Sequence, residues 1–447
     1  MSSYAGAAGQ QDLIANFKEV YGELKDLVPN NMKFIKLVEF TKGSQTGKEF
    51  VEAVVLSLEG GVTYGGERGD AFDLNAPIPL QIESARVQSS EMVLRSAVSM
   101  RALAGSQNDK AAFKRTLTLM TGNMLKSMYH RLEVAMLYGQ DSIGVVEKVT
   151  PVVGDASKIV IKIKDSEWAA GIWVGTNKHK IDFLSPSLAT KRSASNVVAF
   201  AVESYDLEKR EITIVGKDAL EKTVSNISAA DMVANDKIFF YGEVEAGGTP
   251  VHLNSIGLKA IAERRGQLFG IDNTKVPLFQ GNVIAAGDPA VAEAYLDFST
   301  VERAASRGVE KGTSDEEMDT LISVDSWNDL LEDQAAKRRY TGAETSKLKE
   351  GAQELEFYGQ TGTIRIVPST FVKNGYAFAF CKKDLLRIGN YDVTMTPPGY
   401  EDEPITRLEN SQGFQIRVQS DQCLFTAKPG SVTVISNLTN QKLKPKA

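Results

Sequence analysis

The sequence predicts an α+β fold that carries an inserted small β domain, either a barrel or a sandwich. One stretch of helical periodicity, Asn108–Gly139, is much longer than an average helix, and extended segments lie on both sides of it. Between Gly144 and Asn235, short strand-like runs are separated by turn residues, which is typical of a small barrel or sandwich. The 447 residues are enough for two or three domains.

The composition is that of a globular chain. There are 51 Lys and Arg against 57 Asp and Glu, a net charge of −6, whereas a general nucleic-acid binder more often has a basic excess. The only cysteines are Cys381 and Cys423, and three histidines are scattered, so we expect no disulfide framework and no metal site. Without a leader-like N-terminus or an apolar run of about 20 residues, cytoplasmic synthesis and no membrane span are expected.

Motifs of the common enzyme classes are absent, so we expect no catalytic residue, no cofactor-binding residue and no enzymatic activity. The nearest match to a phosphate loop, Gly43–Lys48, has three residues between its glycines instead of four, and Glu49 follows the lysine. No GxGxxG, GxSxG or HExxH occurs. The acidic clusters Asp315–Glu317 and Glu401–Glu403 could pair carboxylates, but nearby turn residues favour solvated loops.

An amphipathic helix is predicted near the N-terminus. Apolar residues recur at steps of four and three along Gln11–Val28, and Pro29 ends the pattern. The helix either packs on its own core or lies as an arm on a neighbouring chain, and the two interpretations stay open.

Residues 50–99 predict two long strands joined by a glycine-rich loop. The strands are Phe50–Leu56 and the extended run Gln81–Ser99, and the loop spans residues 59–70. Such a pair suggests a projecting two-stranded ribbon, which is marginal alone in water and is therefore expected to lean on another surface, for example that of another subunit. The alternative is a hairpin within a larger sheet.

The segment Asn108–Gly139 predicts a rod-like helix of about 45 Å. Its apolar positions advance 22 residues in six steps, or 3.67 residues per step. These positions are Phe113, Leu117, Met120, Met124, Met128, Leu132 and Ala135. Asn108 fits an N-cap and Gly139 a stop. The charged residues of this helix, among them Arg131 and Glu133, are expected on a solvated face; the alternative is a face turned toward DNA.

Six short runs make the predicted β domain, in which 12 basic residues balance 12 acidic ones. The runs are Val145–Val153, Lys158–Ile163, Ile172–Val174, Lys180–Phe183, Val197–Val202 and Glu211–Val215. Beyond this domain the pattern is mixed. Strands are predicted at Lys237–Tyr241, Glu354–Tyr358, Thr363–Val367 and Ala377–Phe380, helices at Ser255–Arg265, Asp288–Arg307 and Ser326–Arg339, and an extended region at Tyr391–Val434.

This order of parts resembles the major capsid protein of tailed bacteriophages, the Hong Kong 97-like shell fold. The resemblance lies in the order and lengths of the segments, chiefly Phe50–Ser99 as the extended loop and Asn108–Gly139 as the spine helix. It implies an N-terminal arm at 1–46, an extended β-hairpin loop at 47–88, a peripheral domain at 89–143 and 389–447, an inserted β domain at 144–235, and an axial domain at 236–388. Asp236–Tyr241, Leu258–Gly266 and Trp327–Arg339 would belong to the axial domain.

The resemblance implies self-assembly, as hexamers and pentamers, into an icosahedral shell that encloses a double-stranded DNA genome. Implied partners are a scaffolding protein, a portal, a decoration or cement protein, and packaged DNA bound non-specifically on the inner face. The chain would be part of the virion and would assemble in the host cytoplasm. Some family members cross-link a lysine of the extended loop to an asparagine, but no lysine lies between Lys48 and Lys110 here.

Three other interpretations remain. The chain could form an encapsulin-like cage that holds an enzyme cargo, in which case protein instead of a genome would co-purify. It could be a cytoplasmic enzyme without a sequence motif, in which case turnover by a small oligomer would be measured. It could be a surface carbohydrate-binding protein, with Trp168, Trp173 and Phe183 lining a sugar site, although such aromatic residues more often pack in a core.

Overall fold

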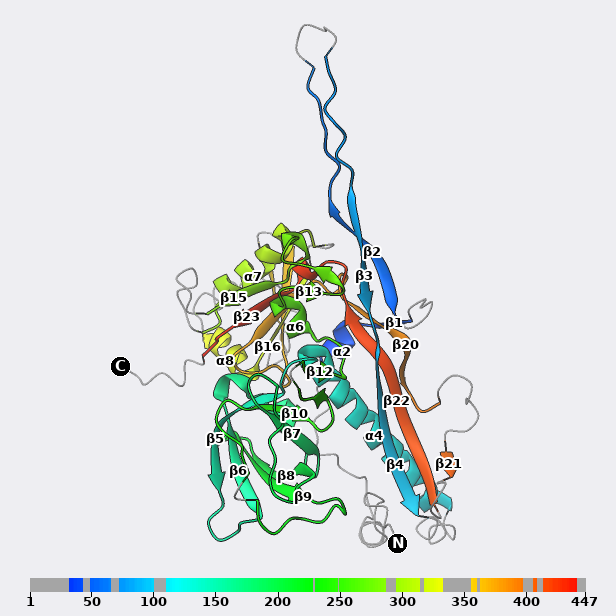
Figure 1. Cartoon of the computed structure of the whole chain (residues 1–447), viewed down its shortest axis with the longest axis vertical. Helices are drawn as coiled ribbons and strands as arrows, with labels where there is room; N and C mark the ends of the chain where they lie inside the picture. The colour runs from blue at the N-terminus through cyan, green and yellow to red at the C-terminus, as the bar shows by residue number, and fades with distance from the viewer. Residues whose placement is uncertain are drawn as a thin grey trace, which may run out of the picture.

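The computed structural model describes residues 32–42, 49–65, 72–99, 110–227, 230–247, 249–286, 295–313, 317–332, 355–359, 362–396, 405–407 and 413–439, and the side chains of the long helix from Met120 onward. A sheet backed by one long helix, a β-barrel and a second sheet with its helices lie together, and a two-stranded ribbon projects from them (Figure 1). The predicted N-terminal helix Gln11–Val28 lies outside these residues.

Helix α4, Lys110–Tyr138, confirms the predicted rod, with 29 residues. Four positions of the predicted apolar stripe are buried, namely Met124, Met128, Leu132 and Ala135. The predicted cap Asn108 and the side chains of Phe113 and Leu117 are not among those described. The stripe therefore faces the protein interior along the part of the helix that can be compared.

A five-stranded sheet packs against α4. Its strands are β1 (Phe40–Lys42), β4 (Ser90–Ser99), β20 (Leu386–Thr394), β21 (Ile405–Arg407) and β22 (Gly413–Phe425). The long strand β22 is central: it pairs antiparallel with β4 on one edge and with β20 and β21 on the other, and β1 joins β20 in parallel. Ile416 and Val418 of β22 pack on Met124 and Met128, so the sheet and α4 share one core.

The ribbon consists of β2 (Phe50–Ser57) and β3 (Gln81–Val87), which pair with each other and with no other strand that the structure describes. An isolated bridge between Gly60 and Ile78 continues the pairing outward. The predicted extended run Gln81–Ser99 is divided, because β3 belongs to the ribbon whereas β4 enters the sheet behind α4. The prediction of a projecting ribbon is confirmed (Figure 1).

Six strands close a barrel in the order β10-β5-β6-β9-β8-β7. They are β5 (Gly144–Pro151), β6 (Lys158–Ile163), β7 (Lys180–Leu184), β8 (Ala199–Asp206), β9 (Glu211–Lys217) and β10 (Lys237–Phe240). Every second residue of β6 is buried, as expected of a strand with one face toward a barrel interior. Of the two predicted β architectures, the barrel is the one observed.

Two assignments around the barrel were wrong. Lys237–Tyr241 was expected in the axial domain, but β10 pairs with both β5 and β7 and closes the barrel. Ile172–Val174 was predicted as a strand, but Ala170–Trp173 forms the short helix α5. Three apolar residues are too few to reveal a period. Within α5, Gly171 packs directly on the backbone of Thr370. A Cβ atom added at Gly171 would lie 2.7 Å from the Thr370 carbonyl oxygen, so a larger residue would not fit there without a shift.

A mixed six-stranded sheet has the order β15-β23-β19-β16-β18-β17. Its strands are β15 (Asn282–Ala285), β16 (Met318–Ile322), β17 (Leu355–Gly359), β18 (Gly362–Pro368), β19 (Ala377–Phe380) and β23 (Thr433–Ser436). The helices of this region are α6 (Leu258–Glu263), α7 (Phe298–Glu310) and α8 (Val324–Glu332). Every residue of β16 and β19 is buried, so both faces of the sheet are covered at its centre.

The start of α7 corrects the prediction of a helix over Asp288–Arg307. Residues 295–297 are not helical, and the helix begins at Phe298. The side chain of Asp297 caps it by accepting a hydrogen bond of 2.8 Å from the Thr300 backbone N–H. The expected start at Asp288 lies outside the described residues, and the cap at Asp297 was not predicted.

The remaining elements are short. They are the helices α2 (Phe34–Leu37), η1 (Asp165–Glu167), η2 (Pro277–Phe279) and η3 (Pro429–Ser431), and the paired strands β11 (Val244–Glu245) with β12 (Val251–His252) and β13 (Gln267–Leu268) with β14 (Ile271–Asp272).

Candidate functional site

The ribbon exposes many large apolar side chains. The exposed fraction is 86% for Leu58, 89% for Tyr64 and 80% for Leu74. With these three, the ribbon surface comprises Val51, Val55, Leu58, Val62, Tyr64, Phe72, Leu74, Ile78 and Ile82. An apolar surface of this kind marks a site of contact with another molecule.

The root of the ribbon is fastened to the body. The ring of Phe50 packs edge-on against Phe425 at 5.2 Å, and the Arg86 backbone N–H donates a 2.7 Å hydrogen bond to the Phe269 carbonyl. Ala85 and, further along β2, Leu56 are also buried in the main core. As far as the structure describes it, the distal half is held by the pairing of its own two arms.

The ribbon is acidic as well as apolar. Residues 49–88 contain seven Asp and Glu but only two Arg and no Lys, a net charge of −5. A partner surface for the ribbon would therefore combine apolar contact with positive charge.

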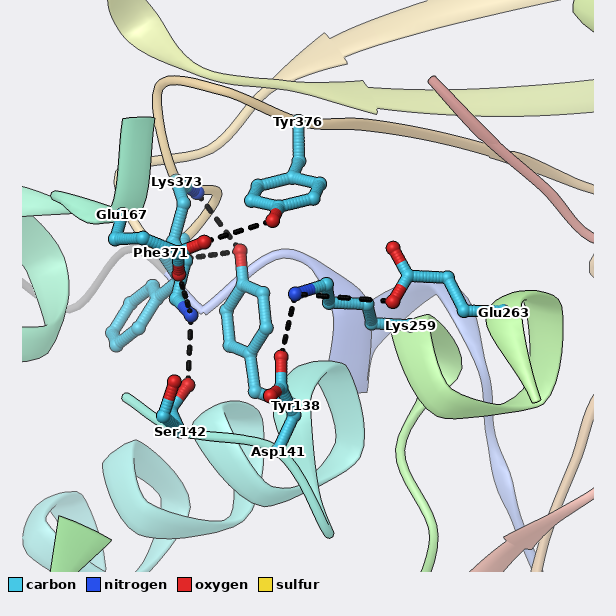
Figure 2. Close-up of polar contacts among 9 residues, drawn as sticks. All are labelled: Tyr138, Asp141, Ser142, Glu167, Lys259, Glu263, Phe371, Lys373 and Tyr376. Atoms are coloured by element: carbon cyan, nitrogen blue, oxygen red, sulfur yellow. Dashed lines mark hydrogen bonds and ion pairs between the residues drawn. The ribbon is translucent and has the colours of Figure 1, made fainter. Parts of the chain in front are cut away.

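A buried polar group that we call the junction cluster lies where α4, the barrel and the six-stranded sheet meet (Figure 2). Its members are Tyr138 at the end of α4, Asp141 in the next turn, Glu167 of η1, Lys259 of α6, and Lys373 and Tyr376 between β18 and β19. The Lys373 ammonium donates to Glu167 Oε2 at 2.7 Å and to the Ser142 carbonyl at 2.7 Å. Lys259 donates to Asp141 Oδ2 at 2.6 Å.

Tyrosine hydroxyls complete the junction cluster. Tyr376 donates to Glu167 Oε1 at 2.8 Å, and Tyr138 accepts a 2.8 Å hydrogen bond from the Lys373 backbone N–H. The hydroxyl of Tyr138 in turn donates to the Phe371 carbonyl at 3.3 Å. Residues from four separate segments are thus joined at one point (Figure 2).

The charges of the junction cluster stabilise one another. Burial alone would raise the pKa of Asp141, but the nearby Lys373 and Lys259 ammoniums outweigh it and lower the pKa to about 2. Burial opposes the charge of Lys259 too, yet Asp141 and Glu167 raise its pKa. Both partners remain charged near neutral pH, so this arrangement fastens chain segments together and does not hold a proton donor ready for transfer.

Two of the predicted solvated charges of α4, Glu133 and the half-buried Arg131, lie against other parts of the chain. Glu133 is fully buried, and its carboxylate accepts hydrogen bonds from the backbone N–H groups of Lys33, Phe34 and Ile35 at 2.8–3.0 Å. The guanidinium of Arg131 lies 3.2 Å from the centre of the Phe240 ring, against the barrel. The solvated-face interpretation was wrong for these two residues, because each joins α4 to a segment distant in sequence.

The three aromatic residues considered for a sugar site lie in the core. Trp168 and Trp173 stack at 6.1 Å, and both are buried, as is Phe183. Within the described ranges, no group of three His, Cys, Asp or Glu could hold a metal ion. Of the two acidic clusters, only Glu317 is described, and it forms an exposed pair with Lys382 at 3.3 Å. No described helix has the length and apolar character needed to cross a membrane.

The sequence analysis did not find the junction cluster or the buried role of Glu133. The cluster residues belong to segments up to 238 positions apart, counted from Tyr138 to Tyr376, so no local spacing relates them. A partial signal existed for Glu133, since a lone carboxylate between Leu132 and Val134 on a mostly apolar helix must be paired if it is buried.

The chain was compared with protein families, curated proteins and solved structures. No protein-family model matches it, and no curated protein does. It is similar to a chain of the cyanophage A-1(L) capsid asymmetric unit, with 13% identity, coverage of 94% of this chain and 96% of that one, and a TM-score of 0.48.

Two further solved structures are similar over nearly the whole chain. A chain of the native GTA particle capsid is 8% identical, with coverage of 94% and 95% and a TM-score of 0.46. A chain of the Myoviridae phage XM1 capsid is 7% identical, with coverage of 95% and 98% and a TM-score of 0.43. Each TM-score is below 0.5, so the function proposed below rests on the geometry of the chain itself.

Proposed function

We propose that this chain is a structural major capsid protein that assembles with copies of itself into an icosahedral shell around a double-stranded DNA phage genome. The ribbon surface carries this proposal. Nine large apolar side chains on a projecting two-stranded ribbon are exposed to water. Contact with a neighbouring subunit would remove their apolar surface from water and so stabilise the assembly. In a closed shell every subunit can offer the ribbon and receive that of a neighbour.

The architecture supports a division of the subunit into several structural parts. We assign the five-stranded sheet with α4 to a peripheral domain, the six-stranded sheet with α6, α7 and α8 to an axial domain, residues 1–46 to an arm, and residues 47–88 to the extended loop. The barrel is an insertion between the peripheral and axial parts, and its C-terminal boundary lies after β10, near Tyr241, instead of at Asn235.

The partners follow from the proposed shell. Hexamers and pentamers of this chain form it, a scaffolding protein guides assembly, a portal and a decoration or cement protein complete it, and DNA meets its inner face without sequence specificity. The chain is then a virion component that assembles in the host cytoplasm. The junction cluster has a mechanical role in this proposal, because it holds helix, barrel and sheet together under the load of a filled shell.

Electron microscopy of the purified chain tests the proposal. We expect closed particles tens of nanometres across, alone or with co-expressed scaffolding protein, and nuclease-protected DNA in particles from infected cells. A stable monomer or dimer under all these conditions would refute shell assembly. Particles that contain a protein cargo and no genome would identify the encapsulin-like cage instead.

A further inference from the structure

Two histidines and an arginine lie at the interface between α4 and the barrel. His130 Nε2 donates a 2.7 Å hydrogen bond to the Gly171 carbonyl of α5. The Arg131 guanidinium lies 3.2 Å from the centre of the Phe240 ring of β10. His179 precedes β7 and lies close enough to both α4 residues for their charges to act on it. Its Nδ1 is buried and has no hydrogen-bond partner in the part of the chain that the structure describes.

The charges around these rings disfavour a further positive charge. Glu243, between β10 and β11, supplies a carboxylate that acts on Arg131. That carboxylate already accepts hydrogen bonds from the Phe240 backbone N–H at 3.2 Å and from the Asn254 side chain. Lys126 adds positive charge to the surroundings of His130, next to that of Arg131. The interface therefore suits neutral imidazoles, whereas an imidazolium would meet cations at short range.

Both imidazoles are accordingly neutral at pH 7. Burial, with Arg131 and Lys126, lowers the pKa of His130 to about 4, although the hydrogen bond to Gly171 opposes the shift. Burial also lowers the pKa of His179 to about 4, and the charges of Arg131 and His130 add to this effect. An imidazole in water has a pKa of about 6.5, so acidification from pH 6.5 to 4 favours a state in which water enters the interface.

Glu243 responds to acid in the opposite direction. Burial raises its pKa to about 7, so its protonated form favours the closed interface below neutral pH. One carboxyl group then opposes two imidazoles, and the imidazoles prevail below about pH 5. Protonation also removes the negative charge of Glu243 from beside Arg131.

The junction cluster is a second contact between α4 and the inserted region, and it resists acid. Although burial would raise the pKa of Asp141, the ammoniums of Lys373 and Lys259 lower it to about 2. Burial also opposes the charge of Glu167, and the same two lysines lower its pKa. These ion pairs therefore persist at pH 4–5, where the interface histidines take up protons.

We propose that the interface between α4 and the barrel is an acid-sensitive contact, in which protonation of His130 and His179 lets the barrel turn away from α4 about the junction cluster. This inference does not depend on the proposed function. The two ends of the inserted region already meet beside the junction cluster, because the Gly257 backbone N–H donates a 2.9 Å hydrogen bond to the Gly139 carbonyl. The barrel keeps its fold during the motion, since its six strands close on themselves.

Energy transfer between two dyes on the full, unassembled chain tests the proposal. The two native cysteines, Cys381 and Cys423, are buried, so introduced surface cysteines can be labelled selectively. Lys209→Cys in the barrel and Lys275→Cys after β14 provide the positions, because these lysine side chains are 71% and 82% exposed. We expect the transfer efficiency to change reversibly between pH 6 and 4, while the far-ultraviolet circular dichroism stays constant.

Histidine variants of the labelled chain identify the groups that titrate. His130→Gln with His179→Gln should abolish the change or move its midpoint at least one pH unit lower, because an amide does not titrate and can still donate to the Gly171 carbonyl. His252→Gln is the matched control and should leave the midpoint unchanged, since the His252 ring lies 6.3 Å from that of Phe239 in the barrel. Thermal melts at pH 7 verify that the variants fold.

If the double variant does not fold, His179→Gln alone serves, because it removes no hydrogen bond from Nδ1 of that ring. It should lower the midpoint by about half a pH unit. Constant transfer down to the pH at which the circular dichroism changes would overturn the proposal. An unchanged midpoint in the histidine variants, or an equal shift in the His252→Gln control, would do the same. The measurement uses the unassembled subunit, so its outcome is separate from that of shell assembly.

Discussion

Glu133 Oε1 accepts a 2.8 Å hydrogen bond from the backbone N–H of Phe34, although 99 positions separate the two residues. The same carboxylate binds the neighbouring N–H groups of Lys33 and Ile35. One buried side chain of α4 therefore fixes the segment that leads into the ribbon. Residues 33–35, which precede the ribbon in the sequence, are thereby held on α4.

Glu133→Gln should destabilise the subunit by about 2 kcal/mol, because the amide offers one acceptor oxygen where the carboxylate offers two, and its NH₂ group faces backbone donors. Urea unfolding of the unassembled chain measures this. Glu208→Gln is the control, since Glu208 is exposed in a barrel turn and should change stability by less than about 0.5 kcal/mol. Equal stability of the two variants would contradict the role of Glu133.

Glu243→Gln should change how stability depends on pH. Burial raises the pKa of Glu243 to about 7, against the charge of Arg131 and hydrogen bonds from Phe240 and Asn254, which lower it. Between about pH 4.5 and 7 the folded chain keeps a proton that the unfolded chain has lost, so this group makes the free energy of unfolding fall as pH rises through that window. Glu243→Gln removes the ionisable group, so the variant does not show this decrease in the free energy of unfolding.

The stability of Glu243→Gln relative to wild type should therefore rise by about 3 kcal/mol between pH 4.5 and 7 and stay constant above it. Comparison of the two chains is needed because burial lowers the pKa values of His130 and His179 to about 4, which increases stability with pH over much of the same range. Denaturant titrations at six pH values give the difference curve. A flat difference would show that Glu243 ionises normally.

Lys373→Met should cost about 3–5 kcal/mol, because it leaves Glu167 buried without its cation. Adding Glu167→Gln removes the uncompensated charge and should recover part of the loss. Thermal unfolding of both variants measures the effect. If the single variant were as stable as wild type, the junction cluster would not fasten the segments that it touches.

Leu58→Asp with Leu74→Asp should prevent assembly and leave the subunit folded. Both side chains are at least 80% exposed, so the folded monomer loses little, whereas an apolar contact with a neighbour would have to bury two carboxylates. Light scattering follows assembly, and far-ultraviolet circular dichroism follows folding. Leu220→Asp, at an exposed leucine of the barrel, is the control that should assemble normally. Normal assembly of the ribbon variant would refute the ribbon surface as a subunit contact.

The sequence predicted best where a period extends over many residues. Helix α4, the ribbon and the barrel strand Lys158–Ile163 agree with expectation, since hydrophobic periodicity is a local property. Prediction from the sequence failed where contacts between distant segments determine the structure. Strand β10 could join either neighbouring domain by its pattern, and only its pairing with β5 and β7 assigns it to the barrel.

The candidate site was likewise predictable only where it depends on a local sequence pattern. The ribbon was visible as two extended runs around glycines, but the exposure of its apolar side chains depends on what the rest of the chain leaves uncovered. The junction cluster brings together residues from remote segments, and no pattern in one sequence relates them. Their charges looked like ordinary surface charges until the fold buried or gathered them.

The barrel gives a prediction with a built-in control. Asp236 is fully buried and receives two hydrogen bonds from the Arg192 guanidinium, at 3.0 Å to Oδ2 and 2.8 Å to Oδ1. The strand that follows it, β10, closes the barrel between β5 and β7. A fragment that ends at Asn235 lacks both features and leaves two strand edges open.

We therefore expect residues 142–241 expressed alone to be soluble and to melt cooperatively with a β-type circular dichroism spectrum. Residues 142–235 should aggregate or unfold without a transition, because the interior apolar side chains would face water along the missing strand. A cooperative melt of the shorter fragment would place the boundary at Asn235 after all. Failure of both fragments would mean that the barrel depends on its contacts with α4, of which the packing of Arg131 on Phe240 is the clearest.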